Sequence, residues 1–149
     1  MKLAEALSIR ADLQRRISQL KSRLKDSAKI QEGDTPIEEA EELCRELDIC
    51  FKQLEEYIFR INRTNMQTLS NGNSLTEMIA RKDVLTLRVS MLREIIRYVV
   101  ETNRFGRNEI RYIRTIDVNK LRKQTDSFAR ELRELDLEIQ NLNWNIDLL

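Results

Sequence analysis

The feature that most constrains this chain is a heptad stripe of apolar residues over residues 118–149. The apolar side chains recur at alternating steps of three and four: Val118, Leu121, Phe128, Leu132, Leu135, Ile139, Leu142, Ile146 and Leu149. Only Thr125 interrupts the stripe. This spacing predicts one helix about 45 Å long with a single apolar face. Because such a helix is stable only when other helices cover that face, the rest of the chain must supply helical partners.

Two other segments show the same spacing. Residues 2 to about 30 carry a stripe that is cleanest at Leu13, Ile17, Leu20 and Leu24. Residues 75 to 103 carry a stripe at Leu75, Met78, Leu85, Val89, Leu92, Ile96 and Val99, which Lys82 breaks. Both segments are predicted to be helices of about 30 residues.

A further helix is predicted to begin at Pro36. Gly33 suits the C-terminal cap of the preceding helix, and Pro suits a first helical position. Thr35 and Glu38 have the spacing of a capping box. The apolar stripe of this helix follows as Ala40, Leu43, Leu47, Cys50, Leu54, Ile58 and Ile61, then Asn65.

Charge is distributed unevenly between the first two predicted helices. The chain through Gln31 has a net charge of +5, whereas residues 32–70 have a net charge of −6. A basic helix joined to an acidic helix by a short loop favours an antiparallel hairpin with complementary flanks.

Two short segments suggest β structure. The Asn71-Gly72 pair lies between Leu69 and Leu75 and can close a tiny hairpin. Residues 109–116 are rich in β-branched and aromatic side chains and partly alternate, so we expect a short strand there. A lone strand needs a partner, which could be residues 28–31 or the same strand of a second subunit.

Composition limits the classes of protein open to this chain. The 149 residues include three Gly, one Pro and no His, with a net charge of +1. The lack of His removes the usual general base and the commonest zinc ligand. We expect no cofactor, no metal and no nucleic-acid partner, and no apolar run approaches the roughly 18 residues of a membrane span. Cys44 and Cys50 are read as ordinary helix residues, Cys50 in the core. Free thiols and the absence of a signal segment favour the cytoplasm.

The fold predicted from these patterns is all-α. We expect an antiparallel up-down-up-down four-helix bundle with coiled-coil-like packing, a short β element at one end, and a single domain over residues 1–149. The alternative is two long hairpins that complete a bundle with another chain. Long heptad stripes and the predicted strand favour a homo-oligomer.

Several short motifs resemble those of a known family. They are the opening Met1-Lys2-Leu3-Ala4-Glu5, then Ile61-Asn62-Arg63-Thr64-Asn65, Ala80-Arg81-Lys82-Asp83-Val84-Leu85, Ala129-Arg130-Glu131-Leu132 and Asn143-Trp144. With these motifs the chain resembles, over nearly its whole length, the septicolysin-like family of small bacterial proteins. The resemblance implies a membrane-active toxin by name, and it implies no catalytic residues.

In an up-down-up-down bundle, one end collects polar side chains from all four helices. The candidate ligand-binding residues at this end are Asn62, Arg63, Asn65, Arg81, Asp83, Asn143 and Trp144. Three interpretations stay open. The residues form a structural network that fixes helix register, or a pocket for a small anion or polar ligand with Trp144 as a wall, or a solvated surface.

Two charged clusters are interpreted as surfaces. The acidic cluster is Glu38, Glu39, Glu41, Glu42 and Glu46, and the basic cluster is Arg104, Arg107, Arg111 and Arg114 with Phe105 and Tyr112. Carboxylate di-metal bundles pair Glu with His on facing helices, and the chain has no His. A solvated acidic flank and a charged strand edge or dimer contact are therefore the favoured interpretations.

The leading functional hypothesis is a non-enzymatic protein-interaction or assembly module, because the chain has helical apolar patterning and no reactive constellation. The alternatives are a septicolysin-like membrane-active toxin and a small-ligand-binding module that uses the polar end.

Overall fold

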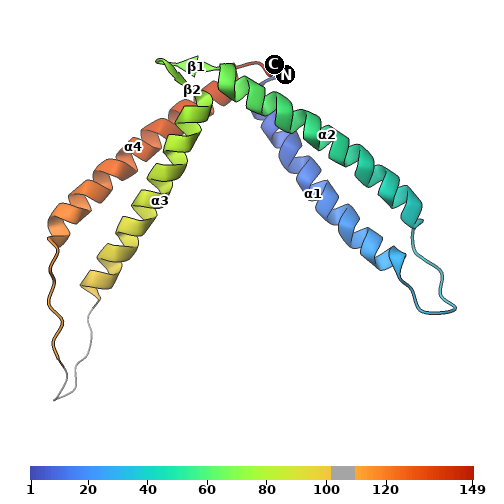
Figure 1. Ribbon diagram of the computed structural model, residues 1–149, viewed down its shortest axis with the longest axis horizontal. Coiled ribbons are helices and arrows are strands. Elements are labelled where there is room, and N and C mark those ends of the chain that lie inside the picture. The colour runs from blue at the N-terminus through green and yellow to red at the C-terminus, as the bar shows by residue number, and fades with distance from the viewer. Residues whose placement is uncertain (102–109) are drawn as a thin grey trace. The chain divides into compact units, whose positions relative to one another are not determined.

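The computed structural model describes residues 1–101 and 110–149 and contains four helices and a two-stranded sheet within them (Figure 1). The elements are α1 (Leu3–Ala28), α2 (Ala40–Gln67), β1 (Leu69–Ser70), β2 (Asn73–Ser74), α3 (Leu75–Val100) and α4 (Val118–Asn145). The predicted all-α class, with four helices and a short β element, is confirmed.

The chain divides into two compact units. The first comprises Met1–Leu75 with Asn141–Leu149, and the second comprises Thr76–Gln140. The single domain over residues 1–149 therefore stays a prediction.

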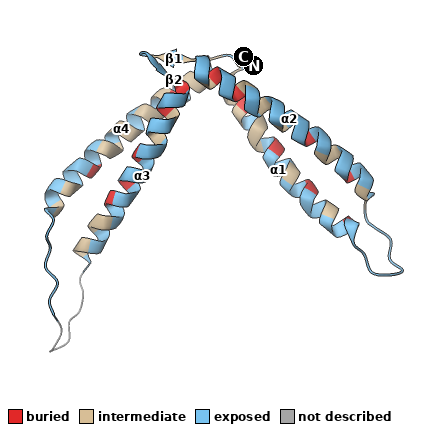
Figure 2. Ribbon diagram, in the orientation of Figure 1, coloured by how far each residue is buried: buried red, intermediate tan, exposed pale blue. Residues whose placement is uncertain are grey.

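In the first unit, α1 and α2 lie side by side and antiparallel (Figure 1). The core cluster between them consists of Leu13, Leu20, Leu43 and Cys50, with Ile9, Ile17, Leu24, Leu47, Leu54 and Tyr57 packed against it. Figure 2 shows buried positions spaced along both helices, as a heptad stripe requires. Burial of a core side chain of this size contributes about 1.5–3 kcal/mol, so the stripe is the main source of stability in the hairpin. Cys50 is buried, as predicted, and Cys44 is exposed.

Ion pairs align the flanks of this hairpin. Arg16 binds Glu46, with 2.6 Å between Nη2 and Oε1, and Arg23 binds Glu38 through both Nε and Nη2. In each pair the arginine comes from α1 and the carboxylate from the following acidic segment. The complementary flanks predicted from the charge distribution are confirmed.

The predicted start of the second helix is wrong. The helix begins at Ala40 instead of Pro36, and its N-cap Glu39 makes no side-chain capping bond. A capping box would require the Glu38 carboxylate to fold back onto the Thr35 backbone, but that carboxylate is bound by Arg23. The Arg23–Glu38 ion pair thus takes the place of the predicted capping box, and residues 36–39 lie outside the helix.

Gly33 also has a different role from the predicted one. The first helix ends at Ala28. Gly33 lies in a turn that is closed by a hydrogen bond of 3.0 Å from the Asp34 N–H to the Gln31 carbonyl. Its φ of +90° is the left-handed conformation that the third residue of such a turn needs, and glycine adopts it without strain.

The apolar stripe of α2 moves by one position near its end. Beyond Leu54 the buried residues are Ile61 and Thr64, with Tyr57 half-buried against the core, whereas Ile58 is 36% exposed. The predicted stripe position Ile58 is therefore wrong, and the fully buried position near the end of the helix is Thr64, next to the half-buried Asn65, because steps of three and of four fit this stretch about equally well.

The predicted Asn-Gly hairpin is confirmed. β1 and β2 pair antiparallel, with Leu69 opposite Ser74 and Ser70 opposite Asn73. Asn71 and Gly72 have φ of 50° and 85°, the two positive values of a type I′ turn. The third helix then begins at Leu75, as expected.

In the second unit, α3 and α4 form another antiparallel pair. Lys82 of α3, which breaks the apolar stripe, forms an ion pair with Asp136 of α4, and Arg88 lies 4.1 Å from the centre of the Phe128 ring. The hydrogen bond from Lys82 holds the pKa of Asp136 below its ordinary value. Thr125, which interrupts the stripe of α4, is buried and donates its hydroxyl to the Leu121 carbonyl. The polar groups of both residues that interrupt the apolar stripes, Lys82 and Thr125, thus have partners within the α3–α4 hairpin.

The predicted strand at residues 109–116 is wrong where the structure describes it. Residues 110–115 have no regular secondary structure, and Ile110, Tyr112 and Ile113 are largely exposed. Glu109, Arg104, Phe105 and Arg107, together with the predicted last turn of the third helix, lie outside the described residues. Asp117 accepts a hydrogen bond from the Lys120 N–H at 3.1 Å and so caps α4, as short polar side chains at helix starts do.

None of the helices within residues 1–101 and 110–149 has the length and apolar content needed to cross a membrane.

Candidate functional site

The polar end of the first unit is built by the chain after α4, which we call the tail (residues 146–149). The Leu3 N–H donates to the Ile146 carbonyl, and the Leu148 N–H donates to the Met1 carbonyl, both at 2.9 Å. Lys2 reaches the same segment, with its Nζ 3.0 Å from an Asp147 carboxylate oxygen. The tail is therefore bound to the start of α1 by backbone and charge together.

The end of α2 binds the last residue of the tail. The Thr64 hydroxyl accepts a hydrogen bond from the Leu149 N–H at 3.0 Å, and it donates to the Arg60 carbonyl at 2.8 Å. Arg60 Nε donates to the Leu149 carbonyl at 3.0 Å. Because Thr64 is fully buried, the two hydrogen bonds at its hydroxyl satisfy a group that has no access to water, whereas the bond from Arg60 lies at the surface. We call Lys2, Arg60, Thr64 and their tail partners the tail network.

The five predicted site residues in the first unit take different environments. Asn62 and Arg63 are exposed on α2, and Trp144 on α4 is 66% exposed. Asn65 and Asn143 are half-buried, and Asn65 Oδ1 is a buried acceptor without a hydrogen-bond partner among the described residues. The tail network thus uses Lys2, Arg60 and Thr64 rather than these residues.

The other two predicted site residues belong to the second unit. Arg81 donates to Glu131 of α4, and Asp83 is exposed. The interaction of Arg81 holds α3 against α4. The ligand-binding role predicted for the seven residues stays a prediction.

Sequence patterns did not single out Thr64 or Arg60. The predicted apolar stripe runs from Ile61 to Asn65 and so does not include Thr64. The available signal was the helical spacing of Leu54, Tyr57, Ile61 and Thr64, which brings a hydroxyl into line with the core.

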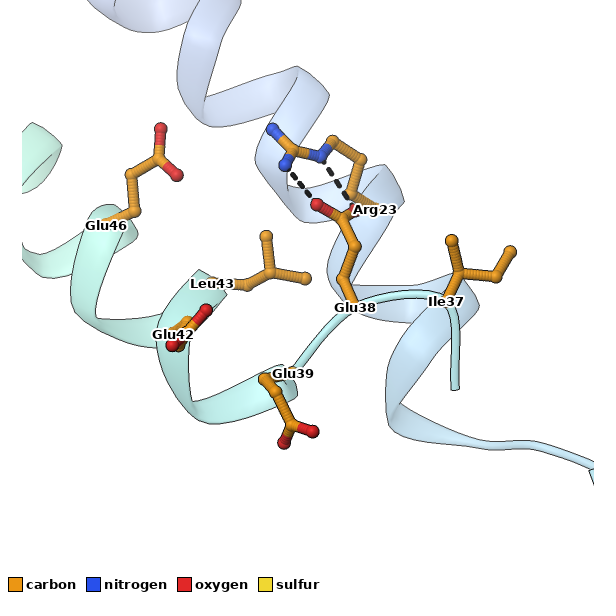
Figure 3. A pocket seen from close by; sticks show the side chains of 7 residues that line it. All are labelled: Arg23, Ile37, Glu38, Glu39, Glu42, Leu43 and Glu46. Atoms are coloured by element: carbon orange, nitrogen blue, oxygen red, sulfur yellow. Dashed lines mark hydrogen bonds and ion pairs between the residues drawn. The ribbon is translucent and has the colours of Figure 1, made fainter. Parts of the chain in front are cut away.

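The opposite end of the α1–α2 hairpin has a pocket of about 340 Å³ (Figure 3). It is lined by Arg23, Ile37, Glu38, Glu39, Glu42, Leu43 and Glu46. In Figure 3 the Arg23 guanidinium lies against the Glu38 carboxylate, and Glu46 extends from the next turns of α2.

Arginines of α1 bind two of the four carboxylates of this pocket. The hydrogen bond from Arg23 lowers the pKa of Glu38 and raises that of Arg23, and Glu46 raises the pKa of Arg16 in the same way. Among residues 1–101 and 110–149 no three acidic or cysteine side chains are grouped so that they could hold a metal ion. Two of the four carboxylates of this pocket are thus engaged in ion pairs with α1.

Comparison with known proteins places the chain in a family. The chain belongs to a family of unknown function, DUF6847, whose model matches residues 10–148. It is also similar to a crystal structure described as that of a functionally unknown conserved protein from Corynebacterium diphtheriae. The two are 38% identical with a TM-score of 0.94, over 100% of this chain and 99% of that chain. No curated protein matches the chain. The septicolysin-like resemblance is tested by neither match and stays a prediction.

Replacing Thr64 by Val should destabilise the protein by about 1–2 kcal/mol more than replacing Thr125 by Val, because the Leu149 N–H is left without an acceptor. Both threonines are buried, and each donates its hydroxyl to the carbonyl four residues earlier. The Thr64 hydroxyl also accepts a hydrogen bond from the Leu149 N–H. Urea unfolding of the two variants measures the difference. Equal losses would show that the tail contributes nothing through this bond.

Acid should weaken the Arg23–Glu38 contact. Since the folded-state pKa of Glu38 lies below its ordinary value of 4.5, its carboxylate favours folding above that value. This contribution is lost as the pH falls through the folded-state pKa. In Arg23→Gln, NMR titration should show the pKa of Glu38 moved up to its ordinary range. Urea midpoints of wild type and variant should differ at neutral pH and converge as the pH falls through the folded-state pKa of Glu38.

Arg15→Gln is the matched control for that titration, because Arg15 pairs with Asp12 of its own helix. It should leave the pKa of Glu38 unchanged. A Glu38 pKa that is the same in wild type and Arg23→Gln would contradict the proposed cause of the shift.

Proposed function

We propose that this chain is a non-enzymatic protein-interaction and assembly module. The observation that supports the proposal is that α3 is apolar on two opposite sides. One side carries the buried stripe of Met78, Leu85, Val89 and Leu92, which packs in the hairpin with α4. The other side carries Val84, Leu87, Met91 and Tyr98, which are exposed.

The exposed apolar side chains of α3 lie at helical spacing, so they form one strip along the helix, which Glu94 interrupts between Met91 and Tyr98. Leu87 is 71% exposed and Tyr98 is 75% exposed. Because a single neighbouring helix covers only one side of α3, its second apolar side is left for a further partner. A contiguous exposed apolar strip rimmed by polar residues is the usual mark of a protein-binding surface.

The charged groups on the hairpins support the same proposal from another direction. Arg16, Arg23, Arg81 and Lys82 each bind a carboxylate across their hairpin. Their role is to hold helix against helix, so these four charged groups are engaged within their hairpins, while the outer apolar side chains of α3 stay open to a partner.

Photo-cross-linking tests this proposal. Benzoylphenylalanine placed at position 87 and irradiated in cells that naturally express the chain should give a defined protein adduct. The matched control is position 133, where Arg133 is an exposed residue of α4. No adduct at position 87, or equal adducts at both positions, would contradict the proposal. Dye release from lipid vesicles by the folded protein would instead favour the membrane-active alternative.

A small-ligand-binding module is the second candidate, and Asn65 favours it. A buried acceptor without a partner costs about 1–3 kcal/mol, and a hydroxyl or amine of a ligand would relieve that cost.

A ligand at 100 times its Kd should stabilise the protein by about 2.7 kcal/mol. A thermal-shift screen of amino acids, sugars and nucleotides, with Trp144 fluorescence as the second readout, should identify a compound that acts on wild type and not on Asn65→Leu. A flat response in both proteins would count against the pocket.

A further inference from the structure

We infer that the outer face of α3 pairs, antiparallel, with the same face of a second copy of this chain. This inference rests on the proposed function and names its partner. The outer face consists of Ala80, Val84, Leu87, Met91, Glu94 and Tyr98, and all six are exposed. Their steps alternate between four and three, which is the heptad spacing of a second coiled-coil seam on the same helix.

The sizes along this seam favour the antiparallel orientation. With the twofold axis near Val89, Ala80 lies opposite Tyr98 of the second copy, so the smallest side chain of the seam meets the largest. Leu87 lies opposite Met91 in the central layers. Each large apolar group therefore has a neighbour that leaves room for it.

Charge along the seam favours the same orientation. In a parallel pair the two copies of Glu94 would face each other, and like charges in contact are destabilising. In the antiparallel pair each Glu94 meets Val84 instead, so the two carboxylates are not in contact.

The residues beside the seam are self-complementary. Asp83, Ser90 and Arg97 occupy successive positions on one flank, seven residues apart. The antiparallel arrangement sets Asp83 against Arg97 of the second copy, twice by symmetry, and Ser90 against Ser90. No side-chain bond to Asp83 or Arg97 is present within the described parts of the chain, so both are available for this contact.

The other flank of the seam is already committed to α4. Arg81 binds Glu131, and Arg88 lies over the Phe128 ring. A second copy therefore approaches from the Asp83 side. One helix face from each copy buries a total surface of about 1,200 Å² at most, which is the low end of the range for specific protein interfaces. We therefore expect the dimer to dissociate at micromolar concentrations.

Analytical ultracentrifugation of the full chain from 1 to 200 µM tests the pairing. Wild type should show a monomer–dimer equilibrium. Leu87→Glu should raise the dissociation constant at least tenfold. The matched control, Leu137→Glu, changes a residue of α4 that is 66% exposed and should leave the constant unchanged.

A charge exchange tests the orientation. Asp83→Arg and Arg97→Asp should each weaken self-association, because each places like charges in contact twice. An equimolar mixture should restore the dimer, since every Arg then meets an Asp. Circular dichroism checks that the exposed substitutions leave the helices intact, and the charge exchange remains decisive where Leu87→Glu fails to fold.

Three results would overturn the inference. They are a wild type that stays monomeric at 200 µM, a dimer that Leu87→Glu does not weaken, and a mixture that does not restore pairing. A monomeric wild type whose position 87 cross-links to a different protein would overturn the inference while leaving the proposed function standing. No cross-link at all would remove both.

Discussion

The structure depends on one requirement, which is that an apolar stripe on a helix must be covered by another helix. The helices of this hairpin have 26 and 28 residues, and 34% of the residues of the whole chain are charged. Such a helix has little stability when it is isolated in water. Packing α1 against α2 buries Leu13, Leu20, Leu43 and Cys50, and that burial outweighs the cost of ordering the loop between them. The ion pairs on the flanks add alignment more than energy, because they lie at the surface and are screened by water.

Sequence periodicity predicted the helices well and their details less well. The start of α3 at Leu75, the Asn71-Gly72 turn and the Asp117 cap follow from local chemistry, which short-range patterns carry. The start of α2 did not follow, because a contact with Arg23, fifteen residues earlier, overrides the local capping box. The strand at residues 109–116 failed for a related reason. Strand propensity needs a pairing edge, and residues 110–115 have none within the described chain.

The site was harder to predict than the fold. The sequence pointed to amides and arginines near the ends of the stripes, and Asn65 does carry a buried acceptor that no described group satisfies. The tail network instead relies on Thr64 and on backbone groups of the tail. Thr64 comes one residue before Asn65, the position at which the predicted stripe of this helix ends. Backbone donors and acceptors are the same for every sequence, so a pattern of side chains cannot reveal them.

The pair of Lys82 and Asp136 has a consequence for how α3 and α4 find each other. Apolar stripes alone permit two helices to slide by a full heptad at little cost, because each leucine meets another leucine. An ammonium group within the stripe removes that freedom. Moving α4 by seven residues in either direction would place Ala129 or Asn143 where Asp136 now stands, leaving the lysine without a counter-ion. The single lysine in the apolar stripe of α3 thus fixes the register of α3 against α4.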